Sequence, residues 1–196
     1  MDKRLVIGMS GASGAPLTVE LLRQLREYHP EVETHLIVTR GAELTLAQET
    51  EVSLEQLRSL AGVCHSNSNI GAAPASGSFK TMGMIVVPCS MKTVAGIVSG
   101  YSDNLLLRAA DVTLKERRKL VLVAREAPLS TVHLRNLYEA SQLGAVILPP
   151  MLAYYNHPAS VEDCTRYTVS RILSQFDLDR DSYQWEGMDE TLSMDP

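Results

Sequence analysis

Five short aliphatic runs, separated by amphipathic stretches, dominate the pattern of hydrophobic and polar positions along this chain. Each run has the length and near-continuous apolar character of a strand buried on both faces of a parallel sheet. The predicted strands are Arg4 to Met9, Thr34 to Thr39, Met84 to Pro88, Leu120 to Ala124 and Ala145 to Leu148.

Helical periodicity fills most of the intervals between these runs. Pro16 suits a first helical turn, and the leucines from Leu17 to Leu25 share one face of the helix that follows. Ser53 with Gln56, and Ser160 with Asp163, have the spacing of residues that begin helices. The further predicted helices run from Ser53 to Leu60, from Leu105 to Arg118, from Leu134 to Leu143 and from Ser160 to Phe176.

The alternation of strand and helix predicts the α/β class. We expect a three-layer, doubly wound parallel sheet of the flavodoxin-like or Rossmann-like kind. The stretch from Cys64 to Thr81 is rich in Ser, Asn, Gly and Ala and is predicted to be a loop. A loop of this length in a compact domain is usually functional.

Composition and charge narrow the class of protein. The 196 residues include 45% hydrophobic and 21% charged residues, which is typical of one globular domain, here residues 1–176. Residues 177–196 form an acidic tail with seven acidic residues and one basic residue, in a chain of net charge −5. No basic face with interleaved aromatics points to nucleic acid, and the three scattered cysteines support neither a disulfide framework nor a zinc site.

The location of the protein is predicted from the same features. No apolar run approaches the ~20 residues that cross a bilayer. The N-terminus leads directly into a strand, without the pattern of a signal peptide. We therefore expect a cytoplasmic protein without a membrane partner.

Two strand-to-helix loops are the candidates for chemistry. The first carries the spacing Gly8-x-x-Gly11-x-x-Gly14 after the first predicted strand. The second, Pro88 to Thr93, offers two hydroxyls, one ammonium group and several backbone N–H groups. Loops of this type at the carboxyl ends of parallel strands bind phosphate groups.

The form of the loops favours a mononucleotide over a dinucleotide. The glycine spacing is not G-x-G-x-x-G, and Thr39 and Arg40, rather than an acidic residue, follow the second strand. A dinucleotide site would need that acidic residue to hold a ribose. For the glycine loop alone, glycines that merely permit tight packing remain the alternative interpretation.

Ordered motifs along nearly the whole chain match one known family. They are Ile7 to Ala15, Glu49-Thr50, Ser76 to Phe79, Pro88 to Thr93, Arg108 to Val112, Leu114 to Arg118, Arg125 to Leu129, Pro149 to Met151 and Tyr154 to Pro158. In these segments the chain resembles the flavin prenyltransferase family of the UbiX/Pad1 type. It looks most similar to the small partner proteins that are encoded with hydroxyaryl-acid decarboxylases.

The resemblance implies a reaction and its partners. A dimethylallyl group passes from dimethylallyl monophosphate, or from the pyrophosphate in some members, to N5 and C6 of reduced FMN. The product, prenylated FMN, serves a UbiD-type aromatic acid decarboxylase. No metal is implied, so protein groups must stabilise the departing phosphate. The family forms large homo-oligomers, typically dodecamers, with sites at subunit contacts.

The resemblance also implies the roles of individual residues. The implied flavin contacts are Gly11, Ala12, Ser13, Thr39, Ser90, Met91, Lys92, Thr93 and Arg125. The implied prenyl-phosphate contacts are Arg108, Lys115, Tyr155 and Arg171. The implied catalytic residues are Ser13 and Glu49, which are associated with late proton transfer, together with Lys115.

Other interpretations of these residues stay open. As a catalytic carboxylate near a phosphate-rich site, Glu49 is expected to have the raised pKa that acid–base work requires. Without the resemblance, Glu49 fits a surface acid at a helix end. Arg171 fits an exposed helix residue, and Lys115 next to Glu116 fits a surface ion pair. Trp185, in the tail, fits either an aromatic lid over the prenyl group or an exposed side chain.

Two other functions compete with the transferase. One is a noncatalytic FMN-binding accessory subunit of a decarboxylase complex, and the other is a flavin-dependent decarboxylase or reductase. A flavin carrier needs none of the prenyl-phosphate residues, so their joint presence favours the transferase. Related decarboxylating flavoproteins use a histidine and an Asn-containing loop, where this chain has Pro-Cys-Ser-Met-Lys-Thr.

Overall fold

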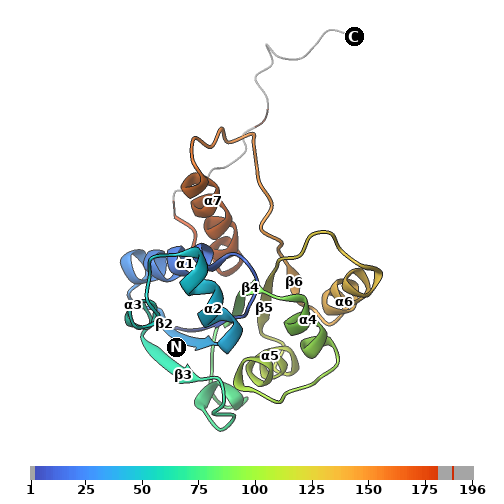
Figure 1. Cartoon of the computed structure of the whole chain (residues 1–196). Coiled ribbons are helices and arrows are strands. Elements are labelled where there is room, and N and C mark those ends of the chain that lie inside the picture. Colours follow the sequence, from blue (N-terminus) through green and yellow to red (C-terminus); the bar gives the residue numbers. More distant parts are fainter. Residues whose placement is uncertain (1–2, 181–186, 188–196) are drawn as a thin grey trace.

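Six parallel strands form one sheet at the centre of the molecule (Figure 1). The computed structural model describes residues 3–180 and residue 187. The order across the sheet is β3-β2-β1-β4-β5-β6. The strands are β1 (Arg4–Met9), β2 (Glu33–Val38), β3 (Val63–Ser66), β4 (Gly83–Cys89), β5 (Lys119–Ala124) and β6 (Val146–Ile147).

Helices cover both faces of this sheet, and this confirms the predicted three-layer, doubly wound α/β fold (Figure 1). Helices α1, α2, α3 and α7 pack on one face, and α4, α5 and α6 pack on the other. The helices are α1 (Ala15–Tyr28), α2 (Arg40–Glu49), α3 (Leu54–Leu60), α4 (Met91–Val98), α5 (Leu105–Lys115), α6 (Thr131–Gln142) and α7 (Val161–Leu173), with short 3-10 turns η1 (Ala73–Ala75) and η2 (Ser174–Phe176). No helix in the described part of the chain is long and apolar enough to cross a membrane.

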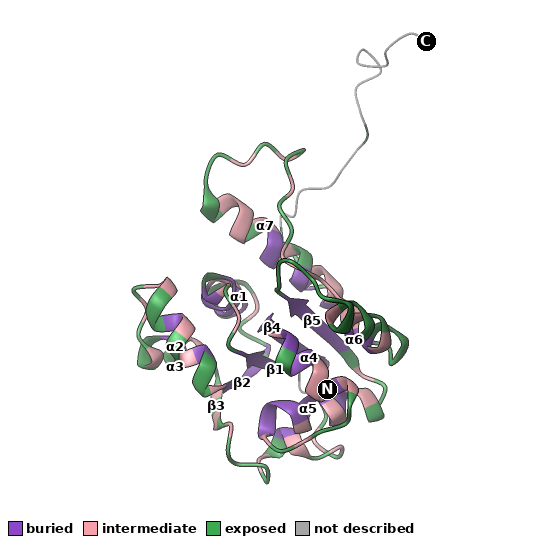
Figure 2. Cartoon of the chain, turned by 45° about the vertical axis from the view of Figure 1, so that its right-hand side comes forward, coloured by how far each residue is buried: buried purple, intermediate pink, exposed green. Residues whose placement is uncertain are grey.

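The core consists of two apolar layers separated by the sheet (Figure 2). Along β1, Leu5, Ile7 and Met9 point into the layer under α1 and α7, whereas Val6 points into the layer under α5. Every residue of β4 is buried. A near-continuous apolar run is therefore the expected sequence for this central strand, because both of its faces are covered.

All five predicted strands are present, but the structure adds a sixth. Residues Val63–Ser66 form β3, where the sequence predicted the start of a loop. This edge strand is four residues long and alternates between half-buried and exposed positions, so it lacks the apolar run that marks the inner strands. The prediction was wrong here because an edge strand hydrogen-bonds on one side only and needs little apolar surface.

The structure also contains a helix that was not predicted and a packed segment beyond residue 176. Helix α2 was not predicted, because Ala42 and Leu46 are its only buried residues and its apolar periodicity is weak. The packed chain also continues past the predicted domain end at residue 176, since Leu178 is 5% exposed and belongs to the layer under α1. The capping boxes predicted at Ser53 and Ser160 are both present.

Pro88 interrupts the hydrogen bonding of the central strand β4, so the carbonyl groups of Val87 and Pro88 accept hydrogen bonds from outside the sheet. The register between β4 and β5 shifts between Val86 and Cys89. The Val87 carbonyl accepts a hydrogen bond of 2.6 Å from the buried Thr18 hydroxyl of α1. The Pro88 carbonyl accepts from both the backbone N–H and the hydroxyl of Ser10, at 3.1 Å and 3.0 Å.

Ser10 also joins the two loops that follow the central strands. Its hydroxyl oxygen accepts a hydrogen bond of 2.8 Å from the backbone N–H of Ser90, while it donates to the Pro88 carbonyl. Ser10 is 1% exposed. The glycine loop after β1 and the loop after β4 are therefore held together by one buried hydroxyl.

We expect Thr18→Val to destabilise the protein by about 1–3 kcal/mol, because it keeps the side-chain shape but leaves the Val87 carbonyl without its buried donor. Denaturant unfolding at one fixed subunit concentration measures this. Thr45→Val is the matched control, since the Thr45 hydroxyl donates to the Gly41 carbonyl on the exposed side of α2. Equal losses in the two variants would contradict a special role for Thr18.

Candidate functional site

A cavity opens where the strand order reverses, at the carboxyl ends of β1 and β4. The chain leaves these neighbouring strands toward opposite faces, into α1 and α4, so the two loops diverge at this point. Ligands of open α/β sheets bind at such a switch point. The cavity has a volume of about 920 Å³, within the range of cofactor pockets.

Five of the residues implied as flavin contacts line this cavity. They are Gly11, Thr39, Ser90, Lys92 and Thr93. Ala12, Ser13, Met91 and Arg125 do not line it, and the Met91 side chain lies in the core under α4. The structure therefore brings together the hydroxyl and ammonium groups of both predicted loops.

Two helices begin at the cavity, each with a hydroxyl side chain as its N-cap. Thr39 accepts from the backbone N–H of Ala42 at 3.2 Å and begins α2. Ser90 accepts from the backbone N–H of Thr93 at 3.3 Å and begins α4. Capping occupies a lone pair of each oxygen. The Ser90 and Thr93 hydroxyls also hydrogen-bond each other at 3.0 Å, so one proton of this pair and that of Thr39 remain to donate. Together with the positive ends of the two helices, these donors suit an anion.

Gly11 allows the first loop to approach the start of α2 closely. A Cβ atom at Gly11 would lie 2.9 Å from the carbonyl carbon of Gly41. At this position the glycine pattern thus reflects contact between two backbones. Both interpretations of the glycine loop therefore apply to Gly11: it permits tight packing against Gly41, and it also lines the cavity.

Glu49 is tied to the first loop rather than to the solvent. Its carboxylate accepts hydrogen bonds of 2.8 Å from the backbone N–H groups of both Gly14 and Ala15, the first donors of α1. Gly14, the N-cap position of α1, has no side chain, and the Glu49 carboxylate at the end of α2 takes the place of a cap.

This environment lowers the pKa of Glu49. Partial burial acts to raise it, but hydrogen bonds from Gly14, Ser13 and Ala15 and the charge of Arg125 outweigh that effect. The raised pKa expected for acid–base work is therefore wrong, because donors surround the carboxylate. Two other residues with predicted roles, Ser13 and Arg125, therefore contribute to the lowered pKa of Glu49.

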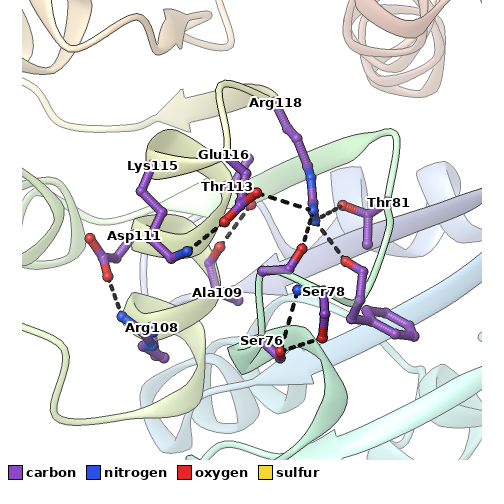
Figure 3. A network of polar contacts seen from close by, with 12 residues as sticks. Ser76, Ser78, Thr81, Arg108, Ala109, Asp111, Thr113, Lys115, Glu116 and Arg118 are labelled. Atoms are coloured by element: carbon purple, nitrogen blue, oxygen red, sulfur yellow. Dashed lines mark hydrogen bonds and ion pairs between the residues drawn. The ribbon is translucent and has the colours of Figure 1, made fainter.

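The residues implied as prenyl-phosphate contacts fall into two groups on opposite faces of the sheet. Arg108 and Lys115 lie on α5, where Arg108 pairs with Asp111 at 2.5 Å and Lys115 with Glu116 at 2.6 Å (Figure 3). Helix α5 begins beside the cavity, and Lys115 lies at its other end, about 15 Å away at the helical rise.

The second group belongs to the other face. Arg171 lies on α7, and Tyr155 lies in the segment before that helix. Tyr155 is hydrogen-bonded to the hydroxyl of Tyr167, and the two rings meet edge to face. Tyr167 and Arg171 are four residues apart on α7 and so share a helix face. Trp185, the predicted lid, lies outside the described residues.

Sequence reasoning missed several polar residues of the cavity wall, and two of them, Ser10 and Asn67, hold the surrounding loops in place. Ser10 was passed over in the glycine loop, although it joins the two loops. Asn67 receives the backbone N–H groups of Leu105 and Leu106 at the start of α5, through its carbonyl and its side-chain oxygen. The polar composition of the Cys64 to Thr81 stretch was the signal for Asn67, since that stretch was predicted to be functional. Among the described residues, no group of three or more His, Cys, Asp or Glu side chains could hold a metal ion.

Comparison with known proteins decides the family. A family model described as Flavoprotein matches residues 1–173. A probable UbiX-like flavin prenyltransferase of Sedimentibacter hydroxybenzoicus is 52% identical over 185 residues, covering 94% of this chain and 97% of the relative. The chain belongs to the flavoprotein family, and within it to the UbiX-type flavin prenyltransferases. The family predicted from the motifs is confirmed.

Solved structures of similar proteins agree with this assignment. A dodecameric FMN-dependent UbiX-like decarboxylase from Escherichia coli O157:H7 has a TM-score of 0.92 at 51% identity, covering 94% of this chain and 100% of that one. AnUbiX (PadA1) in complex with FMN and dimethylallyl pyrophosphate has a TM-score of 0.93 at 48% identity, covering 96% and 100%. Flavin prenyltransferase UbiX of Escherichia coli K12 is 50% identical over 188 residues, covering 94% and 99%.

We expect Glu49→Gln to remove a pH-dependent part of the stability. Because the folded-state pKa of Glu49 is lowered, its stabilisation is complete above the ordinary value of 4.5 and is lost as the pH falls through the folded value. Wild type should exceed the variant by about 1 kcal/mol at neutral pH, as for a lost cap, and the difference should vanish in acid. Urea unfolding across the pH range measures it, with Glu51→Gln, an exposed neighbour, as the control for removing one charge. A difference that persists unchanged into acid would contradict the cap.

Proposed function

We propose that this protein joins a dimethylallyl group from dimethylallyl monophosphate to N5 and C6 of reduced FMN. The observation that carries the proposal is the cavity at the switch point of the sheet, lined by hydroxyl and ammonium groups from both predicted loops, in a chain about half identical to named flavin prenyltransferases. A bond to N5 forms as the carbon–oxygen bond to phosphate breaks. The proton on N5 leaves. The prenyl double bond then takes up a proton, its tertiary carbon bonds to C6 to close the fourth ring, and the proton on C6 leaves, so ring closure takes up one proton and releases one.

The cavity supports FMN as one substrate. Hydroxyl donors from Thr39, Ser90 and Thr93 and the ammonium of Lys92 reach it from two helix N-termini. These groups suit the phosphate and the polar edge of a flavin mononucleotide. We assign flavin binding to these residues together with Gly11, Ala12, Ser13, Met91 and Arg125.

Glu49 suits the late proton transfer as an acceptor. A carboxylate with a lowered pKa is ionised at neutral pH, which is the form that can take up a proton, although it is a weaker base than the carboxylate with a raised pKa that the sequence predicted. Ser13 directly precedes Gly14, whose N–H donates to this carboxylate, so its hydroxyl is placed to pass a proton from the flavin toward Glu49. Arg125 and the N–H groups of α1 keep this carboxylate in place between turnovers.

The prenyl-phosphate residues require more than one copy of the chain. Arg108 and Lys115 lie on the opposite face of the sheet from Tyr155 and Arg171, so one subunit cannot bring all four to one phosphate. We propose a homo-oligomer, a dodecamer as in the Escherichia coli O157:H7 relative, in which neighbouring copies complete each site.

Exposed apolar residues support this assembly. The segment before α7 extends away from the sheet and α6 lies at its edge (Figure 1). Both carry large apolar side chains that are more than half exposed, namely Val132, Leu134, Tyr138, Leu143, Met151, Leu152, Tyr154 and Val161. Apolar surface of this kind marks protein contacts.

The product and its location complete the proposal. Prenylated FMN would be handed to a UbiD-type decarboxylase of an aromatic acid, as the family resemblance implies. We place the enzyme in the cytoplasm, where reduced flavin and the three free cysteines are stable.

An FMN-binding accessory subunit and a flavin-dependent decarboxylase are the competing functions. The second is favoured by the name of one structural relative, an FMN-dependent UbiX-like decarboxylase. Against it, His133 is engaged as the capping residue of α6, where it pairs with Ser130.

Anaerobic incubation with reduced FMN and dimethylallyl monophosphate separates these functions. We expect mass spectrometry of the released flavin to find one added five-carbon unit per flavin. Dimethylallyl pyrophosphate, run in parallel, reports the preferred donor, and an aromatic acid without prenyl donor tests direct decarboxylation. Unmodified flavin with both donors would exclude the transferase. Conversion of the aromatic acid would then indicate the decarboxylase, and no conversion would indicate the accessory subunit.

Shared sites predict that inactive variants rescue each other. Glu49→Gln and Arg171→Ala should each lower the rate about 100-fold or more, as expected for loss of an acid–base or charge-stabilising group. After mixing and reassembly, some sites would combine an intact Glu49 with an intact Arg171 from another copy, so activity should return to a sizeable fraction of the wild-type rate. Mixtures that stay as inactive as their components would show that each site lies within one subunit.

A further inference from the structure

Arg118 holds a serine–glycine–serine turn against the end of α5 (Figure 3). Its guanidinium donates to the Phe79 carbonyl at 2.7 Å and to the Gly77 carbonyl at 2.5 Å, and reaches the Thr81 hydroxyl at 3.4 Å. Only 12% of the Arg118 side chain is exposed. One planar cation therefore joins segments about forty residues apart in the chain, which a single lysine ammonium could not do with the same geometry.

The backbone conformation at the end of α5 directs the Arg118 side chain toward the turn. Arg117 adopts a left-handed conformation with φ 53°, and its N–H bonds the Leu114 carbonyl. The N–H of Arg118 bonds the Thr113 carbonyl, which completes a Schellman motif. The chain thus turns sharply after α5 and directs Arg118 onto the turn at residues 76–79.

Glu116 links Arg118 to Lys115. One carboxylate oxygen of Glu116 accepts a hydrogen bond of 2.6 Å from the Lys115 ammonium, and the other lies 3.9 Å from the Arg118 guanidinium. The carboxylate is thus placed between two cations, one mostly buried and one half-exposed.

Gly77 provides the space for this arrangement. A Cβ atom at Gly77 would overlap the Glu116 carboxylate and lie 2.8 Å from the Lys115 nitrogen. The turn held by Arg118 therefore packs directly on the two side chains beside it. Arg118 fixes the place of Gly77, and Gly77 limits where Lys115 can lie.

We propose that Arg118 is a positioning residue for prenyl-phosphate binding. It holds the turn and Glu116 so that the Lys115 ammonium is presented in one place to the phosphate of the prenyl donor. This inference rests on the proposed function, in which Lys115 contacts that phosphate. Arg118 acts only through Lys115 and does not itself touch the substrate.

The test is steady-state kinetics of Arg118→Lys in the intact oligomer. Lysine keeps the charge but lacks the planar fork of donors by which Arg118 reaches the two carbonyls, so we expect the KM for dimethylallyl monophosphate to rise about tenfold. The affinity for FMN and the kcat at saturating prenyl donor should stay within about twofold of wild type. Arg166→Lys is the matched control, because Arg166 pairs with Asp163 on the exposed side of α7.

Two further variants keep the test decisive. Gly77→Ala leaves Arg118 in place but displaces Glu116 and Lys115, so it should raise the same KM even where Arg118→Lys lowers the yield of folded protein. Lys115→Met should raise that KM by itself, and adding Arg118→Lys to it should then have little further effect.

The outcomes separate this inference from the proposed function. Wild-type enzyme that forms no prenylated flavin would overturn the proposed function itself. Active wild type with an unchanged KM in Arg118→Lys, or additive effects of Lys115→Met and Arg118→Lys, would overturn the positioning role alone. Equal losses of FMN affinity and prenyl-donor affinity would show a merely structural role for Arg118, and would overturn it as well.

Discussion

The interruption of β4 by Pro88 is the constraint on which the site depends. Proline cannot donate to the strand ladder, so the register to β5 shifts and the nearby carbonyls need donors from outside the sheet. Thr18 supplies one donor from α1, and Ser10 supplies two from the glycine loop. Satisfying the backbone of one strand thus ties together both loops that line the cavity.

The N-termini of three helices, α1, α2 and α4, determine where negative charge can be bound around the two loops. The start of α1 is already engaged with the Glu49 carboxylate, whereas the starts of α2 and α4 carry hydroxyl caps that face the cavity. One positive helix end therefore orients a protein carboxylate, and two remain for a phosphorylated ligand. A phosphorylated ligand in the cavity would therefore not compete with the Glu49 carboxylate for the same donors.

The sequence predicted the parts of the fold that bury continuous apolar surface. The four inner strands, the edge strand β6 and the helices with wide apolar faces were found because each carries an apolar run or a periodic apolar pattern. Helix α2 and strand β3 were missed because tertiary hydrogen bonds and edge pairing, rather than apolar faces, hold them. At the site, the hydroxyl side chains of Ser90 and Thr93 in a strand-to-helix loop were enough to predict that both residues line the cavity. The pKa of Glu49 could not be read from sequence, since its donors Gly14 and Ala15 are more than thirty residues away in the chain.

The separation of α5 from α7 by the sheet has a consequence for regulation. If the donor phosphate is bound by side chains of several copies, an isolated subunit keeps its flavin cavity but has no complete place for the second substrate. Dilution would then separate flavin binding from transfer, because the first needs one chain and the second needs an assembly. Subunit concentration becomes a variable of catalysis, and surface residues on α5 and α7 come under selection for chemistry that takes place in a neighbour.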